Sequence, residues 1–122
     1  MLTEKHVAVV GSRAFQNYLQ LKKILDEYLQ EDDIIVSGGA IGVDSMAQRY
    51  AKERGIDIII FYPKYNRYGR GATFVRNEKI VAKSNLVLAF YAIGRFQQGG
   101  TANSVGWAQK LNVPYLEFEE SI

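Results

Sequence analysis

IIVSGGAIGVD, residues 34–44, decides the fold, because a short apolar run passes through glycines into a helix-like pattern. The same order recurs in HVAVVGSRAF (residues 6–15) and in NLVLAFYAIGRFQQGGTANS (residues 85–104). Where a buried strand opens into a helix through glycine, backbone N–H groups and the positive end of the helix dipole face the same space. Proteins hold phosphate groups in this way. Three such turns therefore predict a nucleotide-type ligand.

The apolar pattern predicts alternating strands and helices along the chain. We expect strands at residues 6–10, 34–37, 57–62, 86–90 and 114–118, and helices at 18–29, 43–54, 73–83 and 101–111. Residues 63–71 contain proline, asparagine and two glycines, so we expect a long functional loop there.

Strands that read as continuous apolar runs between helices are typical of a parallel sheet covered on both faces. Right-handed crossovers leave few arrangements. We predict one Rossmann-like, three-layer α/β domain over residues 1–122, with a five-stranded parallel sheet in the order 3-2-1-4-5. Ligands of such sheets bind at the switch point beyond the carboxyl ends of the strands, which gathers the loops after strands one, two and four around one crevice.

Composition excludes several classes of protein. The 122 residues are 48% hydrophobic and 23% charged, which fits one globular domain. The lack of cysteine excludes disulfides, thiolate catalysis and cysteine-ligated metals. The single histidine, His6, begins the first apolar run, so we expect a strand residue there and neither a metal nor a cofactor. Without a signal-peptide core or an apolar run near roughly 20 residues, we expect a soluble, cytoplasmic protein, cellular or viral, with no membrane partner.

Charge placement is more informative than the net charge of +2. At the predicted carboxyl edge lie five of the seven arginines: Arg13, Arg67, Arg70, Arg76 and Arg95. Asp32, Asp33 and Asp57 lie at the opposite edge. The planar guanidinium suits phosphate, although a solvated surface is the alternative. Four tyrosines at the same edge could stack on a base or simply pack a loop: Tyr62, Tyr65, Tyr68 and Tyr91.

Several motifs together resemble the SLOG superfamily, which groups DNA-processing protein A, the LOG phosphoribohydrolases and small stand-alone nucleotide-binding proteins. They are GSRAF, SGGAIGVDSMA, the Arg76 and Asn77 pair in FVRNEKIVAKSNLVLAF, and GGTANSVGWA. The resemblance covers residues 6–118 and is nearest to the small stand-alone members. It implies a Rossmann-like fold that binds nucleotides or nucleotide-derived ligands at its glycine loops.

The candidate ligand-binding residues are Gly11, Ser12, Arg13, Ser37, Gly38, Gly39, Asp44, Arg76, Asn77, Gly99, Gly100 and Thr101. The three glycine loops would cradle phosphate, with turn and capping chemistry as the structural alternative. Asp44 would repel phosphate, so a ribose hydroxyl or the first turn of its helix suits it better. The resemblance places Arg76 and Asn77 near the ligand, with a packing or salt-bridge role as the alternative.

The resemblance is weakest for catalysis. LOG phosphoribohydrolases carry PGGxGTxxE, whereas this chain has QQGGTANS, without the proline and with Ser104 at the glutamate position. A hydroxyl cannot replace that carboxylate as acid, base or cation stabiliser. Asp44 and Glu78 are the remaining weak candidates, and transfer of a deoxyribosyl group through one of them stays open.

Three functions follow from these residues. The first is a module that binds a nucleotide or a nucleotide derivative, as a sensor or a sequestering protein. The second is a nucleoside-monophosphate N-glycosidase or deoxyribosyltransferase. The third is single-stranded DNA binding, against which the modest net charge argues. We also expect a homo-oligomer, with Trp107 and the last helix as one candidate surface.

Overall fold

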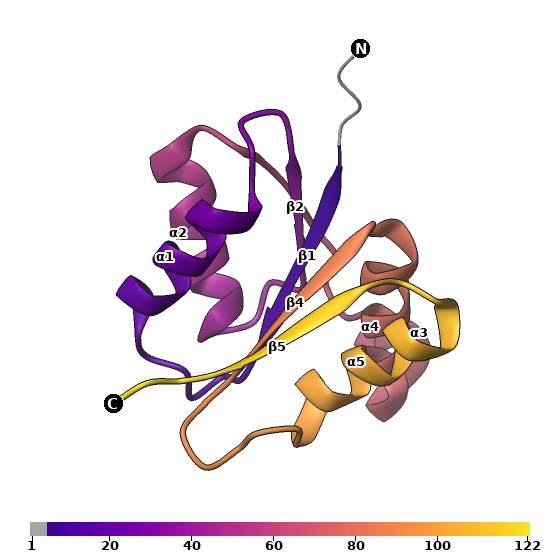
Figure 1. Ribbon diagram of the computed structural model, residues 1–122. Coiled ribbons are helices and arrows are strands. Elements are labelled where there is room, and N and C mark those ends of the chain that lie inside the picture. Colours follow the sequence, from indigo (N-terminus) through magenta and orange to yellow (C-terminus); the bar gives the residue numbers. More distant parts are fainter. Residues whose placement is uncertain (1–4) are drawn as a thin grey trace.

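Five parallel strands form one twisted sheet in the computed structural model, which describes residues 5–122 (Figure 1). The strands are β1 (His6–Gly11), β2 (Ile34–Ser37), β3 (Asp57–Ile60), β4 (Leu86–Tyr91) and β5 (Tyr115–Glu119). Their order is β3-β2-β1-β4-β5, and every neighbouring pair is parallel. The predicted fold class and strand order are therefore confirmed.

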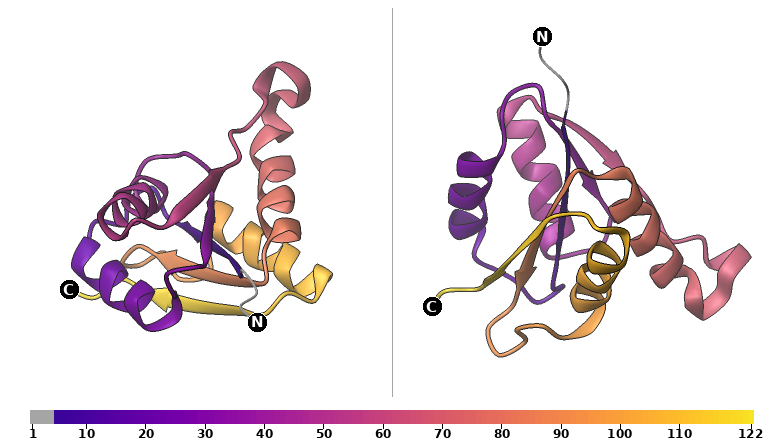
Figure 2. Two further views of the ribbon diagram at one scale, coloured as in Figure 1. Left: turned by 90° about the horizontal axis from the view of Figure 1, so that it is seen from above. Right: turned by 45° about the vertical axis from the view of Figure 1, so that its right-hand side comes forward.

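Helices cover both faces of the sheet. They are α1 (Tyr18–Tyr28), α2 (Val43–Arg54), α3 (Tyr65–Tyr68), α4 (Ala72–Lys83) and α5 (Gly99–Leu111), with one 3-10 turn, η1 (Gly69–Gly71). α1 and α2 lie on one face, and α4 and α5 lie on the other (Figures 1 and 2). None of the helices between residues 5 and 122 combines the length and apolar character needed to cross a membrane.

Alternating residues of the central strands supply a separate core to each face. Val7 and Val9 of β1 pack with Leu21, Leu25 and other apolar residues under α1 and α2. Ala8 and Val10 face the other way, toward Ile80 of α4 and Val105 of α5. Because the central strands are buried on both faces, they read as unbroken apolar runs, and this is why the sequence pattern located them.

The segment after β3 differs from the expected long loop. Residues 65–71 form the short helix α3 and the turn η1, which project from the body of the domain ahead of α4 (Figure 2). Gly69 has a φ of 57° and ends α3, so the glycines in this stretch bound short helical turns. We call residues 63–71 the arm.

Candidate nucleotide-binding pocket

One pocket of about 920 Å³ lies beyond the carboxyl ends of the strands. The segments that follow β1, β2, β3 and β4 all contribute to it, together with the first turns of α4 and α5. β1 and β4 are neighbours at the middle of the sheet, where the strand order reverses. The pocket therefore lies at the switch point, where sheets of this kind bind their ligands.

Most of the sequence-predicted ligand residues line this pocket. They are Gly11, Ser12, Arg13, Gly38, Gly39, Asp44, Arg76, Asn77, Gly99, Gly100 and Thr101. Ser37 is fully buried and does not line it, and its hydroxyl has no hydrogen-bond partner among the described residues. Of the two weak catalytic candidates, Asp44 lines the pocket and Glu78 does not.

The N-terminus of α5 is open toward the pocket. The helix begins at Gly99, after Gln98, whose side chain makes no capping hydrogen bond, and no acidic residue lies in its first turn. Gln98, Gly99, Gly100 and Thr101 all line the pocket. Four backbone N–H groups at a helix start lack partners within the helix and carry a partial positive charge. This end of α5 can accept an anion.

The N-terminus of α1, in contrast, already holds a carboxylate. α1 begins at Tyr18, as expected, and its cap is Asn17, which accepts from the amide of Gln20. The backbone N–H groups just before the helix donate to Glu120, at 2.7 Å and 2.9 Å. At this turn the structure fits the alternative of turn and capping chemistry, because Glu120 already binds the amides in front of the helix.

Gly11 and Ser12 instead hold the centre of the sheet together. A Cβ atom on Gly11 would overlap the side chain of Val43 and the carbonyl oxygen of Phe90. The amide of Ser12 donates to Phe90 O at 2.9 Å, and its hydroxyl oxygen accepts from the amide of Ala92 at 3.0 Å. The loops after β1 and β4 are thereby tied to each other beneath the pocket.

Asp44 and Arg76 both line the wall of the pocket, where the charge of Arg76 acts on Asp44. Burial raises the pKa of Asp44, while the backbone N–H of Ala40, at 3.0 Å, and the charge of Arg76 act in the opposite direction. The Arg76 guanidinium also donates to the carbonyl oxygen of Gly38 and to the side-chain oxygen of Asn77. Arg76 therefore already makes hydrogen bonds within the protein, which agrees with the alternative structural role predicted for this residue.

Asn77 extends the same network to α5. It is buried, and its side-chain nitrogen donates to Asn103 Oδ1 at 3.0 Å and to the carbonyl oxygen of Gly100 at 3.4 Å. Ser104 is buried as well and donates to the same carbonyl. Asn77 thus links α4 to the open end of α5, and it lines the pocket beside that end.

We expect Asp44→Asn to flatten the pH dependence of stability. A carboxyl whose pKa is raised on folding binds more protons in the native state, so the contribution of Asp44 to stability falls as the pH rises above about 4, the ordinary carboxyl range. The asparagine variant should lack this fall. Arg76→Ala should steepen it and lower the free energy of unfolding at pH 7 by about 2 kcal/mol. Urea unfolding between pH 4 and 7 measures both effects, and an equal pH slope in wild type and Asp44→Asn would contradict this account.

The predicted positive edge is only partly observed. Arg13 and Arg95 are exposed and line the pocket, whereas Arg67 and Arg70 lie on the arm. Glu119 and Glu120 lie at the carboxyl end of β5, on the same edge, and their charges oppose the predicted polarity. Around the pocket itself the charge is still mainly positive, since three arginines and the single carboxylate of Asp44 line it.

Of the four tyrosines, two have free faces at the pocket. Tyr62 and Tyr65 line it and are 62% and 57% exposed. Tyr91 is fully buried, and its hydroxyl donates to Glu117 at 2.7 Å, so of its two expected roles the structure fits packing and not stacking on a base. Tyr68 lies on the arm with the cations of Arg67 and Lys79 over its ring. A base can therefore stack on Tyr62 or Tyr65.

The structure adds residues to the predicted set. Arg95, Gln98 and Thr73 line the pocket, although the predicted ligand set contained none of them. Arg95 and Gln98 lie in the segment between β4 and α5. The glycine-rich loop after this strand was already recognised in the sequence, and it could have been used to predict both residues. Among residues 5–122, no three His, Asp or Glu side chains are placed to hold a metal ion.

Comparisons with known proteins agree with this architecture. A family model described as DNA recombination-mediator protein A matches residues 1–65. The Gene 61 protein of Mycobacterium phage D29 is 29% identical over 126 residues, which cover 93% of this chain and 96% of that protein. DNA processing protein A (DprA) from Streptococcus pneumoniae matches in structure with a TM-score of 0.78 and 22% identity, over 97% of this chain and 51% of that one. The chain thus spans about half the length of that solved protein.

Proposed function

The chain belongs to the DNA recombination-mediator protein A family, and from this premise we propose that its pocket binds a phosphate-bearing nucleotide. The observation that carries this proposal is the open N-terminus of α5, which faces the same pocket as the exposed Arg13 and Arg95. Helix-end amides and guanidinium groups are the two donors that proteins most often direct at phosphate. At the other two glycine turns a carboxylate already lies near the helix start. Glu120 binds the amides before α1, and Asp44 lies in the first turn of α2.

The rest of the nucleotide has a place in the same pocket. Its volume of about 920 Å³ is within the roughly 300–1,000 Å³ usual for small-molecule sites. Tyr62 and Tyr65 offer exposed rings on which a base can stack. Arg76 and Asn77 act in this proposal mainly as supports, because their polar groups already bind within the protein.

The proposal is for binding and not for cleavage. Most glycoside-cleaving enzymes place two carboxylates on either side of the scissile bond. Asp44 is the one carboxylate among the described residues that line the pocket, and Ser104 occupies the position of the glutamate in the LOG pattern. No observation favours a second carboxylate that would complete such a pair.

Thermal unfolding with a panel of nucleosides, mononucleotides, cyclic nucleotides and dinucleotides tests the proposal. A ligand that binds only the folded protein, at 100 times its Kd, adds about 2.7 kcal/mol of stability, which is a shift of several degrees in this size of domain. Phosphate-bearing ligands should give this shift, and matching nucleosides should give much less. The proposal fails if no member of the panel changes the melting temperature.

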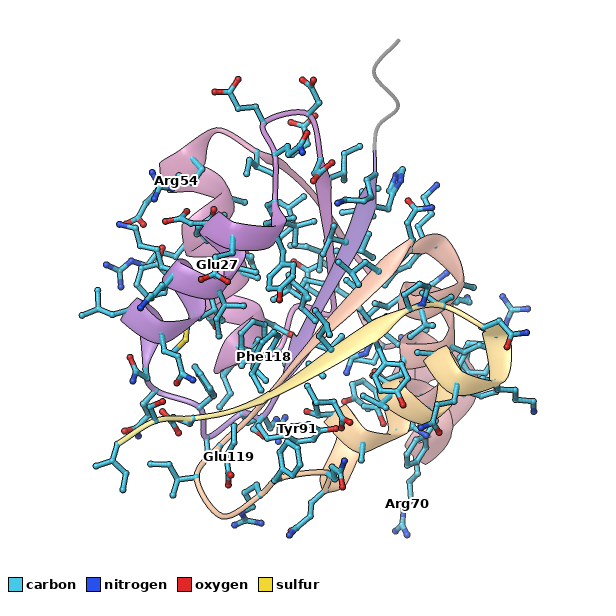
Figure 3. The ribbon with its side chains drawn as sticks, in the orientation of Figure 1. Glu27, Arg54, Arg70, Tyr91, Phe118 and Glu119 are labelled. Carbon is cyan, nitrogen blue, oxygen red and sulfur yellow. The ribbon has the colours of Figure 1, made fainter. Side chains whose placement is uncertain are left out.

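Single-stranded DNA is the second candidate, and the arm favours it. Between Asp57 and Glu78 the chain has four cations and no acidic residue, and three of the cations lie on the arm: Lys64, Arg67 and Arg70. All three are exposed, and Arg70 extends away from the body of the domain (Figure 3). The arm begins in the pocket wall, because Pro63 and Tyr65 line the pocket. A strand with one nucleotide in the pocket could continue along these cations.

If a strand follows the arm, Arg70→Ala should weaken oligonucleotide binding and leave mononucleotide binding unchanged. Each lost phosphate contact should lower the slope of log K against log salt by about 0.7 for a single strand. Lys23→Ala, which removes an exposed cation from α1, is the matched control. Titrations of a dT oligonucleotide at several salt concentrations measure the slope. Equal affinities for dTMP and the oligonucleotide, with no effect of Arg70→Ala, would restrict the ligand to one nucleotide.

A further inference from the structure

The side chain of Glu120 connects two loops that are far apart in the sequence. Glu120 follows β5, and its backbone N–H donates to the carbonyl oxygen of Tyr91 at 2.8 Å, which holds it at the end of β4. One carboxylate oxygen, Oε2, accepts from the amides of Gln16 and Asn17 at 2.7 Å and 2.9 Å. The other, Oε1, accepts from the amide of Ile93 at 3.3 Å. One carboxylate therefore bridges the β1–α1 loop and the β4–α5 loop.

The two bridged loops carry the two exposed arginines of the pocket. Arg13 lies three residues before Gln16, and Arg95 lies two residues after Ile93. Glu119, next to Glu120, accepts from the amide of Gly94 at 3.3 Å and so also binds the β4–α5 loop. Figure 3 shows Glu119 beside this loop. The remaining direct link between the loops is the bond from the Ala92 amide to the Ser12 hydroxyl. That bond lies where both loops leave their strands, whereas Glu120 holds the β1–α1 loop at its other end, directly before α1.

We propose that Glu120 is a positioning residue that sets the separation of Arg13 and Arg95 across the pocket. Both carboxylate oxygens accept from N–H groups, and a negative charge is favourable near the N-terminus of α1. A glutamine has one acceptor oxygen, and its NH₂ group would face a backbone N–H, so it cannot bridge both loops. The effect of Glu120 on ligand affinity rests on the proposed function, whereas its effect on the loops does not.

The first test uses the protein without ligand. The chain has no cysteine, so Arg13→Cys and Arg95→Cys place nitroxide labels at these two positions alone. Electron paramagnetic resonance should give a narrow distribution of label separations in the parent and a broader one with Glu120→Gln. Glu120→Asp keeps the charge but shortens the side chain, and it should broaden the distribution too. Glu27→Gln removes a carboxylate from an exposed site on α1 and should leave the distribution narrow (Figure 3).

The second test measures ligand binding with both arginines present. Glu120→Gln should raise the Kd for dAMP or pdTpdT about tenfold, the size of one lost charge-assisted hydrogen bond. Glu27→Gln makes the same change in net charge and should not raise it. Arg95→Ala should cost less affinity in the Glu120→Gln background than in wild type, which a merely structural role of Glu120 would not produce.

An unchanged label separation in both Glu120 variants would overturn the positioning role whatever the ligand result. If the Glu120 variants broaden the distribution of label separations but the wild type binds no nucleotide, the proposed function is rejected and the positioning role is still supported. The two proposals can therefore fail separately.

Discussion

Gly39→Val is expected to lower the melting temperature by roughly 10 to 20 °C and to remove nucleotide binding, the largest effect that we predict for a single substitution. Gly39 has a φ of 73°, a conformation that strongly disfavours a β-branched residue. Its Cβ would lie 2.5 Å from Tyr62 Cε1 and 3.0 Å from Ile60 Cγ2. The added side chain must displace Tyr62, which is one of the two exposed rings that line the pocket.

Gly55→Val separates the effect of backbone strain from the effect of steric overlap. Gly55 has a similar φ of 67° and no atom within 4 Å of an added Cβ, so this variant has the backbone strain without the overlap. It should lose about 1–3 kcal/mol of stability. Calorimetric melting of both variants gives the comparison. Equal losses in the two variants would mean that contact with Tyr62 is not what requires glycine at position 39.

The double variant Arg13→Ala, Arg95→Ala should raise the Kd for a nucleotide at least about 100-fold and leave the melting temperature of the free protein nearly unchanged. A charge-assisted hydrogen bond to phosphate contributes roughly 1.5–3 kcal/mol, and two of them are removed. Both side chains are exposed at the pocket, and surface substitutions of this kind usually change stability by less than about 0.5 kcal/mol.

Lys23→Ala, Lys52→Ala is the matched control for that experiment. It removes the same number of charges from exposed positions on α1 and α2. Isothermal titration at physiological salt then separates a local contact from long-range attraction, because distant exposed charges are screened under these conditions. A double arginine variant that binds as well as the lysine control would exclude Arg13 and Arg95 from the site.

The sequence predicted the elements that depend on local pattern. The apolar runs of β1, β2 and β4 are buried on both faces, so pattern and structure agree there to within a residue. Strand order followed from the connections, because right-handed crossovers leave few alternatives. The glycine loops were located for the same reason, since each directly follows a strand.

The sequence could not predict contacts between residues that are far apart in the chain. Glu120 lies 103 and 104 positions from the two amides that it binds in front of α1, and no local pattern marks it as their partner. Tyr91 follows Phe90 at the carboxyl end of β4, and only packing against Phe96 and Glu117 shows that its ring is buried. The structure of the arm was missed for a different reason. Proline and glycine indicate where regular structure breaks, but they do not show that short helical turns form between the breaks.

The most direct test of the proposed site is the response of the α5 amides to phosphate. In ¹H–¹⁵N correlation spectra, dAMP should shift the backbone amides of Gly99, Gly100 and Thr101, which begin α5 at the pocket. Deoxyadenosine at the same concentration should leave these three amides in place, because it has no phosphate. Equal shifts with the nucleoside, or shifts confined to residues outside the pocket, would contradict a phosphate site at the N-terminus of α5.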